Sequence, residues 1–488
     1  MDAQRPLQSS PAKPDWVLFS ARPRYTMSML KLWNTRTRSL ETFIPLKPPA
    51  VGLYTCGPTV YGPPHLGNLR SYIFADTLRR VLRFNGFDVQ QVMNITDVGH
   101  LTHDSDSGEE KMDTAAKQEG LDPMAIAAKY TTLFRENLRA LNIEEPDVWA
   151  PATEHIPEQV ALVERLMAKG VAYETPQAVY FDVIKFPDYG ALTGQKLTDK
   201  KTAARDEVEV DADKHHPADF ALWFKRTGRF ANHILHWPSP WGEGFPGWHL
   251  ECSAMSMKYL GEQFDIHTGG VDLIMPHHSN EIAQSEAATG KSPFVNVWMH
   301  GEFLQLEKRM GKSEGNSILL KDVIERDIPP LAYRYFVLQA HYRSVLNFSW
   351  EALEAAAQGY QNLVDRVGAL GPDARVGCAE FEQRFRDAIN DDLNTPQAIA
   401  IMGELLKSDY PSHAKRQSLT VFDEILGLNL LANRVEEPVP TDVQKLLEQR
   451  EAARANKDFE AADHPRQEIT AAGFTIDDTP AGPRLRRS

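Results

Sequence analysis

The stretch VGLYTCGPTVYGPPHLGN, residues 51–68, decides the fold of this chain. Its apolar run 51–55 predicts a strand, and the apolar spacing of residues 69–83 predicts a helix, so the Gly/Pro-rich segment between them is a strand-to-helix loop. Such loops aim backbone N–H groups at anions. His65 would donate to a phosphate, and Gly67, which lacks a Cβ, would let a nucleotide base approach the backbone. Taken alone, the string His-x-Gly-Asn favours an ordinary turn.

The segments around this loop predict a parallel sheet interrupted by an insertion. Residues 51–145 alternate apolar strands, such as 89–95, with helical patterns, which favours a βαβ unit. Residues 146–245 are Pro-punctuated and dense in charge, and they read as an inserted domain. The motif FDIHTGG, residues 264–270, then resumes the strand-plus-glycine pattern. We therefore expect one nucleotide-binding sheet split by an insertion.

The part of the chain beyond Pro329 has a different, helical texture. Amphipathic runs at 331–341, 350–370 and 381–406 predict helices. A Glu/Pro-rich linker at 436–440 precedes a last small unit.

Length, charge and cysteine content narrow the class of protein. A chain of 488 residues suggests about three to five structural units. The balance of 53 basic and 67 acidic residues gives a net charge of −14, which argues against a surface that grips nucleic acid throughout. Three cysteines far apart in sequence make a disulfide framework improbable. No apolar stretch is long enough to span a membrane and no secretory signal is present, so we expect a cytosolic protein.

Local basic segments remain candidates for contact with nucleic acid. The C-terminal Arg484–Arg487 is one, and Arg334 and Arg343, set among tyrosines, form another. Solvated surface charge is the commoner explanation for either.

Four residues have the chemistry of a zinc site. His277 and Glu281 are four residues apart after Pro276, which puts both on one helix face. With Cys252 and Cys56 they would form a Cys₂-His-Glu set that suits tetrahedral Zn²⁺. His278 is the closest rival ligand, and plain burial is the commoner fate of any one such residue.

Such a metal would join two halves of the sheet at the mouth of the nucleotide cleft. It would act either as a clamp or as an acceptor of a fifth ligand from a substrate. Because soft sulfur binds Zn²⁺ far better than a neutral hydroxyl does, a thiolate is the natural fifth ligand, and the site would select cysteine over serine.

The glycine-bearing basic segment EKRMGKSEGN, residues 307–316, is a second candidate for phosphate chemistry. It reads equally as an exposed turn. Opposite the His65 loop, Arg309 and Lys312 could hold the pyrophosphate of ATP and neutralise charge in an adenylyl-transfer transition state.

Taken together, these motifs resemble the class I aminoacyl-tRNA synthetase family and, within it, its cysteine-specific branch. The resemblance rests on CGPTVY (56–61), HLGN (65–68), NITD (94–97), GWHLECS (247–253), PHHSNE (276–281) and the Lys312–Ser313 loop. Their order covers nearly everything from Met29 onward. Each motif alone is weak, and the set is highly specific.

The resemblance implies an ATP-dependent cysteine--tRNA ligase with tRNA(Cys), L-cysteine and ATP as partners. It implies that Cys56, Cys252, His277 and Glu281 bind one zinc ion, which receives the substrate thiolate. Gly57, Thr96, Trp248 and Asp272 would surround the amino acid, with Asp272 meeting its ammonium group. The ATP-binding residues would be Thr59, His65, Gly67, Asn68, Arg309, Met310, Lys312 and Ser313, and of these His65, Asn68 and Lys312, with Mg²⁺, would stabilise the transition state.

The resemblance also implies the fold and the domain order. We expect an α/β protein with a Rossmann-like catalytic domain split by an insertion, then a helical bundle and a small C-terminal domain that binds the tRNA anticodon. The boundaries are 1–28 for an N-terminal extension, 29–145 and 246–302 for the catalytic halves, 146–245 for the insertion, 303–348 for the signature-loop and stem-contact region, 349–435 for the bundle and 436–488 for the last domain. We expect a cytoplasmic monomer.

Four positions in three segments depart from the family pattern: Arg309, Gly311, Asn68 and Pro465. The usual Lys-Met-Ser-Lys-Ser is Arg309–Ser313 here, with Gly311 in place of a serine, so one hydroxyl is missing. Asn68 replaces the last histidine of the family's HIGH signature, and an amide N–H can substitute for an imidazole donor. Pro465 stands within a predicted C-terminal helix.

Two rival functions fit part of the pattern. A ligase that passes activated cysteine to a small amine shares the catalytic motifs, but such relatives usually lack a terminal RNA-binding unit. A non-catalytic, zinc-stabilised RNA-binding homologue would account for the altered signature loop.

Overall fold

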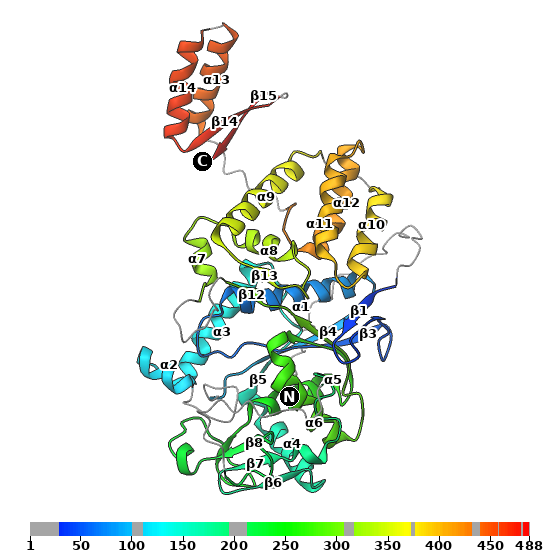
Figure 1. The fold of residues 1–488 in the computed structure, drawn as a ribbon. Helices are drawn as coiled ribbons and strands as arrows, with labels where there is room; N and C mark the ends of the chain where they lie inside the picture. The colour runs from blue at the N-terminus through cyan, green and yellow to red at the C-terminus, as the bar shows by residue number, and fades with distance from the viewer. Residues whose placement is uncertain are drawn as a thin grey trace, which may run out of the picture. The chain divides into compact units, whose positions relative to one another are not determined.

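The computed structural model describes residues 29–99, 111–194, 212–306, 317–371, 376–431, 440–456, 458–479 and 482–487. The chain forms two compact units, residues 1–430 and 431–488, which are described separately below. Across the described residues, no helix combines the length and the apolar character needed to cross a membrane. The elements of the first unit are shown in Figure 1.

A five-stranded parallel sheet forms the centre of the first unit. Its strands are β3 (Ala50–Thr55), β4 (Asp88–Ile95), β5 (Val148–Pro151), β10 (Phe264–Gly270) and β11 (Val295–Gly301), in the spatial order β11-β10-β3-β4-β5. The order reverses between β3 and β10, because the chain adds strands outward from β3 on one side and from β10 on the other. This sheet confirms the predicted Rossmann-like fold.

Helices cover the sheet and connect its strands. The connecting helices are α1 (Leu66–Phe84), α2 (Lys111–Glu119), α3 (Pro123–Ala140), α5 (Trp248–Leu260) and α6 (Ser279–Thr289). Most residues of α1 are buried, so this helix is central to the unit rather than a surface element. A hairpin of β1 (Lys31–Asn34) and β2 (Ser39–Thr42) precedes the sheet.

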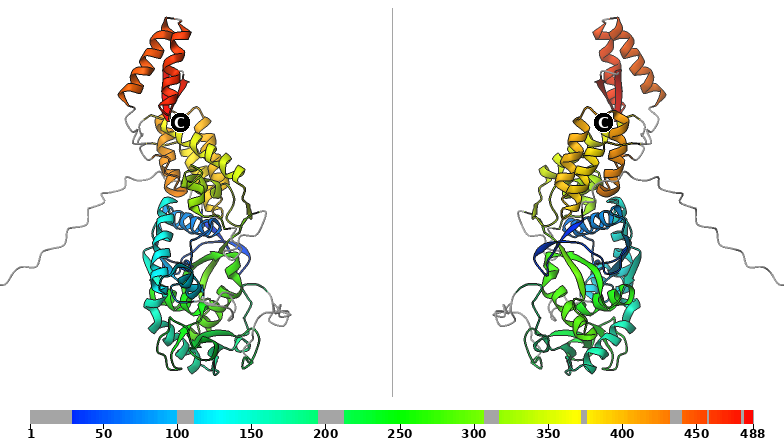
Figure 2. Two further views of the ribbon diagram at one scale, coloured as in Figure 1. Left: turned by 90° about the vertical axis from the view of Figure 1, so that its left-hand side faces the viewer. Right: turned by 90° about the vertical axis from the view of Figure 1, so that its right-hand side faces the viewer.

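A second, antiparallel sheet lies in the insertion. It contains β6 (Ala172–Glu174), β7 (Ala178–Phe181), β8 (Phe220–Lys225) and β9 (Gly244–Pro246), preceded by α4 (Ile156–Ala168). The main sheet takes up β5, so it includes residues that we assigned by sequence to the insertion. In Figures 1 and 2 this second sheet and the helical bundle lie at opposite ends of the main sheet.

The helical region begins beyond the main sheet. It contains α7 (Leu320–Ile324), α8 (Pro330–Leu338), α9 (Trp350–Gly368), α10 (Ala379–Asn390), α11 (Thr395–Lys407) and α12 (Ser412–Leu426), while β12 (Leu304–Gln305) pairs with β13 (Leu346–Asn347). The amphipathic run 381–406 is not one helix. Asp392 and Leu393 adopt positive φ values of 55° and 57°, and Asn394 caps a new helix.

The second unit is small and has its own core. It contains α13 (Thr441–Ala455), α14 (Phe459–Ala471) and the antiparallel pair β14 (Phe474–Thr479) and β15 (Gly482–Arg487). Val443, Ile469 and Phe474 are buried together. Pro465 lies inside α14, and the helix continues through it.

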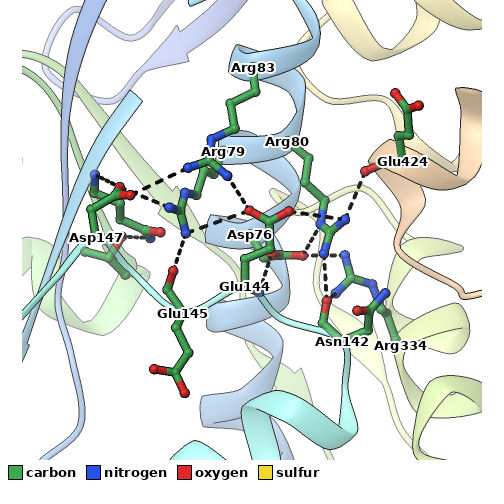
Figure 3. A network of polar contacts seen from close by, with 12 residues as sticks. Asp76, Arg79, Arg80, Arg83, Asn142, Glu144, Glu145, Asp147, Arg334 and Glu424 are labelled. Carbon is green, nitrogen blue, oxygen red and sulfur yellow. Dashed lines mark hydrogen bonds and ion pairs between the residues drawn. The ribbon is translucent and has the colours of Figure 1, made fainter. Parts of the chain in front are cut away.

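A buried ionic network joins α1 to the helical region (Figure 3). Asp76 of α1 accepts hydrogen bonds from Arg334 Nη2 at 2.5 Å and from Arg80 Nε at 2.8 Å. Arg334, on α8, also donates to the carbonyls of Leu426, Leu141 and Asn142. The side chain of Arg334 is fully buried, so it is not the nucleic-acid contact that its tyrosine-rich neighbourhood suggested.

The charges of this network set the ionisation of Asp76. Burial raises the pKa of this carboxyl, but Arg334 and Arg80 outweigh burial and hold its pKa below the usual value. Asp76 is therefore a carboxylate at neutral pH, and Arg334 ties together α1, the end of α3 and the end of α12.

Replacing Arg334 tests how much this network stabilises the fold. Arg334→Met should lower the free energy of unfolding by about 3–5 kcal/mol, because it leaves a carboxylate and several carbonyls buried with fewer partners. The matched change is Arg384→Met, since Arg384 pairs with Glu404 at 2.5 Å on the exposed surface; that change should cost less than about 1 kcal/mol. Denaturant unfolding followed by circular dichroism measures both, and equal losses would contradict the assignment.

Candidate functional site

The site lies at the carboxyl ends of β3 and β10, where the strand order reverses. β3 leads directly into Cys56, whose N–H donates to the carbonyl of Thr268 in β10 at 3.1 Å. β10 ends in Gly269 and Gly270 and leads into the 3₁₀ turn Val271–Leu273, which carries Asp272. In open α/β sheets ligands bind at such a switch point.

Two cysteines, two histidines and a glutamate converge there. Cys252 comes from α5, His277 and His278 from the turn Ile274–His278, and Glu281 from α6. Cys56 Sγ lies 4.0 Å from Cys252 Sγ. His277 Nε2 lies 3.1 Å from Glu281 Oε1, as the predicted spacing on one helix face requires.

The donor set fits a tetrahedral metal ion. Two thiolates bound at about 2.3 Å to one Zn²⁺ would be roughly 3.8 Å apart, close to the distance seen here and far from the ~2.0 Å of a disulfide. Glu281 is fully buried, and its Oε1, 3.1 Å from His277 Nε2, makes no hydrogen bond of good geometry within the described part of the chain. A buried carboxylate oxygen in that position is a natural metal ligand.

His278 is the alternative fourth ligand. Its Nε2 lies 3.3 Å from Cys56 Sγ and 3.9 Å from Glu281 Oε1. Cys56, His277, His278 and Glu281 each offer a ligand atom within 4.8 Å of all the others. The other ring nitrogen of His278 contacts His300 Nε2 at 2.7 Å. This mutually close set contains His278 in place of Cys252, which the sequence favoured and which lies 4.0 Å from Cys56 Sγ.

The electrostatics of this cluster favour positive charge at its centre. Burial lowers the pKa of His277, but Cys252 and Glu281 outweigh burial and raise it to about 10. Burial likewise raises the pKa of Glu281, but His267 and His277 outweigh it and lower the pKa to about 2. Glu281 is therefore a carboxylate at neutral pH, whereas burial raises the pKa of the Cys252 and Cys56 thiols.

The residues predicted to surround the amino acid border this cluster. The ring of Trp248 stacks on His277 with centroids 4.3 Å apart. The N–H of Gly57 donates to Asn94 Oδ1 at 2.7 Å. A Cβ at position 57 would lie 1.7 Å from the carbonyl oxygen of Asn94, so only glycine fits. The charge of Asp272 contributes to raising the pKa of Cys56, after burial and Glu281.

Asn94 and Glu251 complete a buried polar chain that sequence reasoning did not assign. Asn94 Nδ2 donates to Thr96 Oγ1 at 3.0 Å, and Thr96 Oγ1 donates to Glu251 Oε2 at 2.9 Å. This series of hydrogen bonds links Gly57, next to Cys56, with Glu251, next to Cys252. The signal in the sequence was that Asn94 and Glu251 stand within the motifs NITD (94–97) and GWHLECS (247–253).

The predicted phosphate turn begins α1. His65 caps the helix: its Nδ1 accepts from the N–H of Asn68 at 3.1 Å, and Asn68 Oδ1 accepts from the N–H of His65 at 3.2 Å. Gly67 lies in the first helical turn, and Thr59 pairs with Thr96. The amide of Asn68 thus shapes the turn as well as offering donors toward a ligand.

The predicted signature-loop residues Arg309, Met310, Lys312 and Ser313 lie outside the described residues. The segment that follows them is described. The N–H of Leu66 donates to the carbonyl of Ile318 at 2.9 Å, and His65 pairs with Leu319. The chain just beyond the signature loop therefore lies against the phosphate turn.

Comparison with known proteins identifies the family. The family described as "tRNA synthetases class I (C) catalytic domain" matches residues 42–358, and the "DALR domain" matches residues 384–408, across α10 and α11. The chain is therefore a class I aminoacyl-tRNA synthetase.

Curated relatives specify the branch. The chain is 46% identical over 462 residues to "Cysteine--tRNA ligase 1" of Burkholderia lata, an alignment that covers 93% of this chain and 96% of that protein. It is 44% identical over 483 residues to "Cysteine--tRNA ligase" of Thermus thermophilus, with coverage of 94% and 99%. The chain belongs to the cysteine--tRNA ligase family, which confirms the resemblance and the enzyme class that the motifs predicted.

A solved structure supports the fold. The chain is similar to a methionyl-tRNA synthetase of Mycobacterium tuberculosis bound by methionyl-adenylate, with a TM-score of 0.52 and 16% identity over 84% of this chain and 96% of that one. At this identity the likeness concerns the fold alone.

Proposed function

We propose that this chain activates L-cysteine with ATP and transfers it to tRNA(Cys). The observation that carries the proposal is the cluster of Cys56, Cys252, His277 and Glu281 beside the phosphate turn of α1. One loop then carries both a metal ligand that would recognise the thiol of cysteine and a helix N-terminus that would bind the phosphates of ATP. The two substrates must lie next to each other to react.

The reaction has two steps and needs no side-chain nucleophile. In the first, a carboxylate oxygen of cysteine bonds to the α-phosphorus of ATP, and the bond from that phosphorus to the bridging oxygen breaks to release pyrophosphate. In the second, the oxygen of a hydroxyl of the terminal ribose of tRNA bonds to the cysteinyl carbonyl carbon, the bond from that carbon to the phosphate oxygen breaks, and AMP leaves with the electron pair and takes up the hydroxyl proton. The protein contributes positioning and charge stabilisation.

The roles of individual residues follow from chemistry and placement. His65, the N–H of Gly67 and the side chain of Asn68 hold the ATP phosphates, and Lys312 with Arg309 neutralises the leaving pyrophosphate. ATP enters as its Mg²⁺ complex. Asp272 meets the ammonium group, and Gly57, Thr96 and Trp248 bound the pocket for the side chain. We further propose a cytoplasmic, monomeric enzyme.

Zinc is the metal that this donor set suits best. A bound Zn²⁺ would supply a soft Lewis acid for the substrate thiolate. Cys56 and Cys252 would hold it with His277 and Glu281, while His267, 3.1 Å from Glu281 Oε2, orients the carboxylate. His278 and His300 would lie outside the ligand set as its support.

The choice between Cys252 and His278 can be tested by metal content. Cys252→Ser should lose the zinc bound per chain on dialysis against a weak chelator. His278→Asn should retain it with affinity reduced by about 10- to 100-fold, as expected for a supporting residue. The matched control is Cys378→Ser, because Cys378 is buried at the start of α10, where its N–H bonds Ser418, and it should keep full zinc. Retention in Cys252→Ser with loss in His278→Asn would assign the ligand to His278 instead.

Cysteine-dependent exchange of pyrophosphate into ATP tests the activity. The zinc-loaded full chain should catalyse exchange with L-cysteine and prefer it to L-serine by roughly 10⁴-fold or more, because a site built around one group rejects the analogue that lacks it. Exchange should fall with removal of zinc and return when zinc is restored.

The same assay separates the rival functions. No exchange by zinc-loaded protein would favour the non-catalytic RNA-binding reading. Exchange followed by transfer of labelled cysteine to small amines and not to tRNA would favour the small-amine ligase, and transfer to tRNA supports the synthetase. Equal exchange with serine would contradict thiol recognition.

A further inference from the structure

Two neighbouring residues of α8 hold α1 at two separate places. The hydroxyl of Tyr333 donates to the carbonyl of Leu66 at 2.7 Å, and Arg334 Nη2 donates to Asp76 at 2.5 Å. Leu66 lies in the first turn of α1, and Asp76 is ten residues further on, almost three turns along the helix. The side chains of Tyr333, Arg334 and Leu66 are all fully buried. The phosphate turn is therefore fixed to the helical region from within the core.

Leu66 is also held from its other side. Its N–H is one of the first-turn donors that have no partner inside the helix, and it donates to the carbonyl of Ile318 at 2.9 Å. Its carbonyl receives the Tyr333 hydroxyl. Both partners belong to the chain that follows the segment with Lys312. Leu66 thus joins the phosphate turn to Ile318 and to Tyr333 of α8, both of which follow the signature loop in the sequence.

The hydroxyl of Tyr333 is not needed to satisfy α1. Within an α-helix the carbonyl of residue i already accepts from the N–H of residue i+4. Burial raises the pKa of Tyr333, so the group is a neutral donor at any physiological pH. Phenylalanine would fill the same space without the desolvation cost of a hydroxyl. The extra bond therefore fixes the position of a backbone that is already paired.

We infer that Tyr333 is a positioning residue for adenylate formation. Its hydroxyl sets the place of the Leu66 carbonyl, and with it the turn that carries His65 and Asn68, relative to Ile318 and Leu319. The inference rests on the proposed function, because the turn matters to the rate only if it holds ATP. Adenylyl transfer depends on placing two substrates and their charge-stabilising groups together, so a small displacement of this turn slows the reaction step.

Tyr333→Phe removes only the hydroxyl, and the chain offers a matched control. Tyr360 of α9 is also buried and also donates to a backbone carbonyl, that of Leu428 at 2.9 Å, within the bundle. In cysteine-dependent pyrophosphate exchange, Tyr333→Phe should lower kcat by about tenfold, as a displacement of part of an ångström predicts. The KM for L-cysteine and the zinc content should stay within twofold of the wild-type values. Tyr360→Phe should leave kcat within twofold.

A second measurement does not depend on activity. Hydrogen–deuterium exchange should be faster in the first turn of α1 in Tyr333→Phe and unchanged there in Tyr360→Phe, because the Tyr333 hydroxyl donates to that turn and the Tyr360 hydroxyl donates to Leu428 instead. The inference is overturned if kcat of Tyr333→Phe stays within twofold of wild type, or if both variants lose activity equally. Absence of exchange activity in the wild type would instead overturn the proposed function, and the deuterium experiment would still decide whether Tyr333 fixes the turn.

Discussion

The parallel pairing of β10 with β3 is the interaction on which the rest of the site depends. Three register pairs join the strands, Ile266 with Leu53, His267 with Tyr54 and Thr268 with Thr55. Cys56 follows one strand, and the turn with His277 follows the other, although Cys56 and Cys252 are 196 residues apart in sequence. Bringing two such distant residues together costs conformational entropy, and the pairing of the strands already offsets that cost. The metal ligands are therefore positioned by the sheet. A metal site of this kind exists only when both halves of the sheet have formed.

The site depends secondly on α1, whose first turn would bind ATP phosphates and whose buried Asp76 pairs with Arg334 further along the helix. His65 and Asn68 shape its first turn, while Asp76 binds the buried Arg334 further along. A buried ion pair adds little stability over an apolar pair, and its loss is costly because one charge stays buried alone. Its contribution here is to fix α8, and through Tyr333 the phosphate turn, in one arrangement. Rigidity at the anion-binding end is what adenylyl transfer requires.

Much of this architecture was predictable from the sequence, for identifiable reasons. The strand before Cys56 and the helix after it follow from apolar periodicity and a Gly/Pro-rich turn. His277 and Glu281 meet because helical spacing puts them on one face. The site as a whole was predictable only from the set of motifs, since each ligand alone is most often a buried core residue.

Other features depend on tertiary contacts that no local pattern contains. Arg334, set among tyrosines, was a candidate for contact with nucleic acid, yet it is completely buried and bonds to partners from α1, the end of α3 and the end of α12. The break between α10 and α11 occurs at Asp392 and Leu393, non-glycine residues with positive φ, where the sequence carries no glycine signal. Spacing also could not decide between Cys252 and His278, because both lie beside Cys56 only after the sheet closes.

X-ray absorption at the zinc K-edge tests the central claim most directly, because it counts the sulfur ligands that the two halves of the sheet supply. The zinc-loaded chain should show two sulfur ligands, at about 2.3 Å, and addition of L-cysteine should raise the count to three while L-serine leaves it at two. A single sulfur ligand, or a count that L-cysteine does not change, would contradict a metal site built by Cys56 and Cys252 to read the substrate thiol.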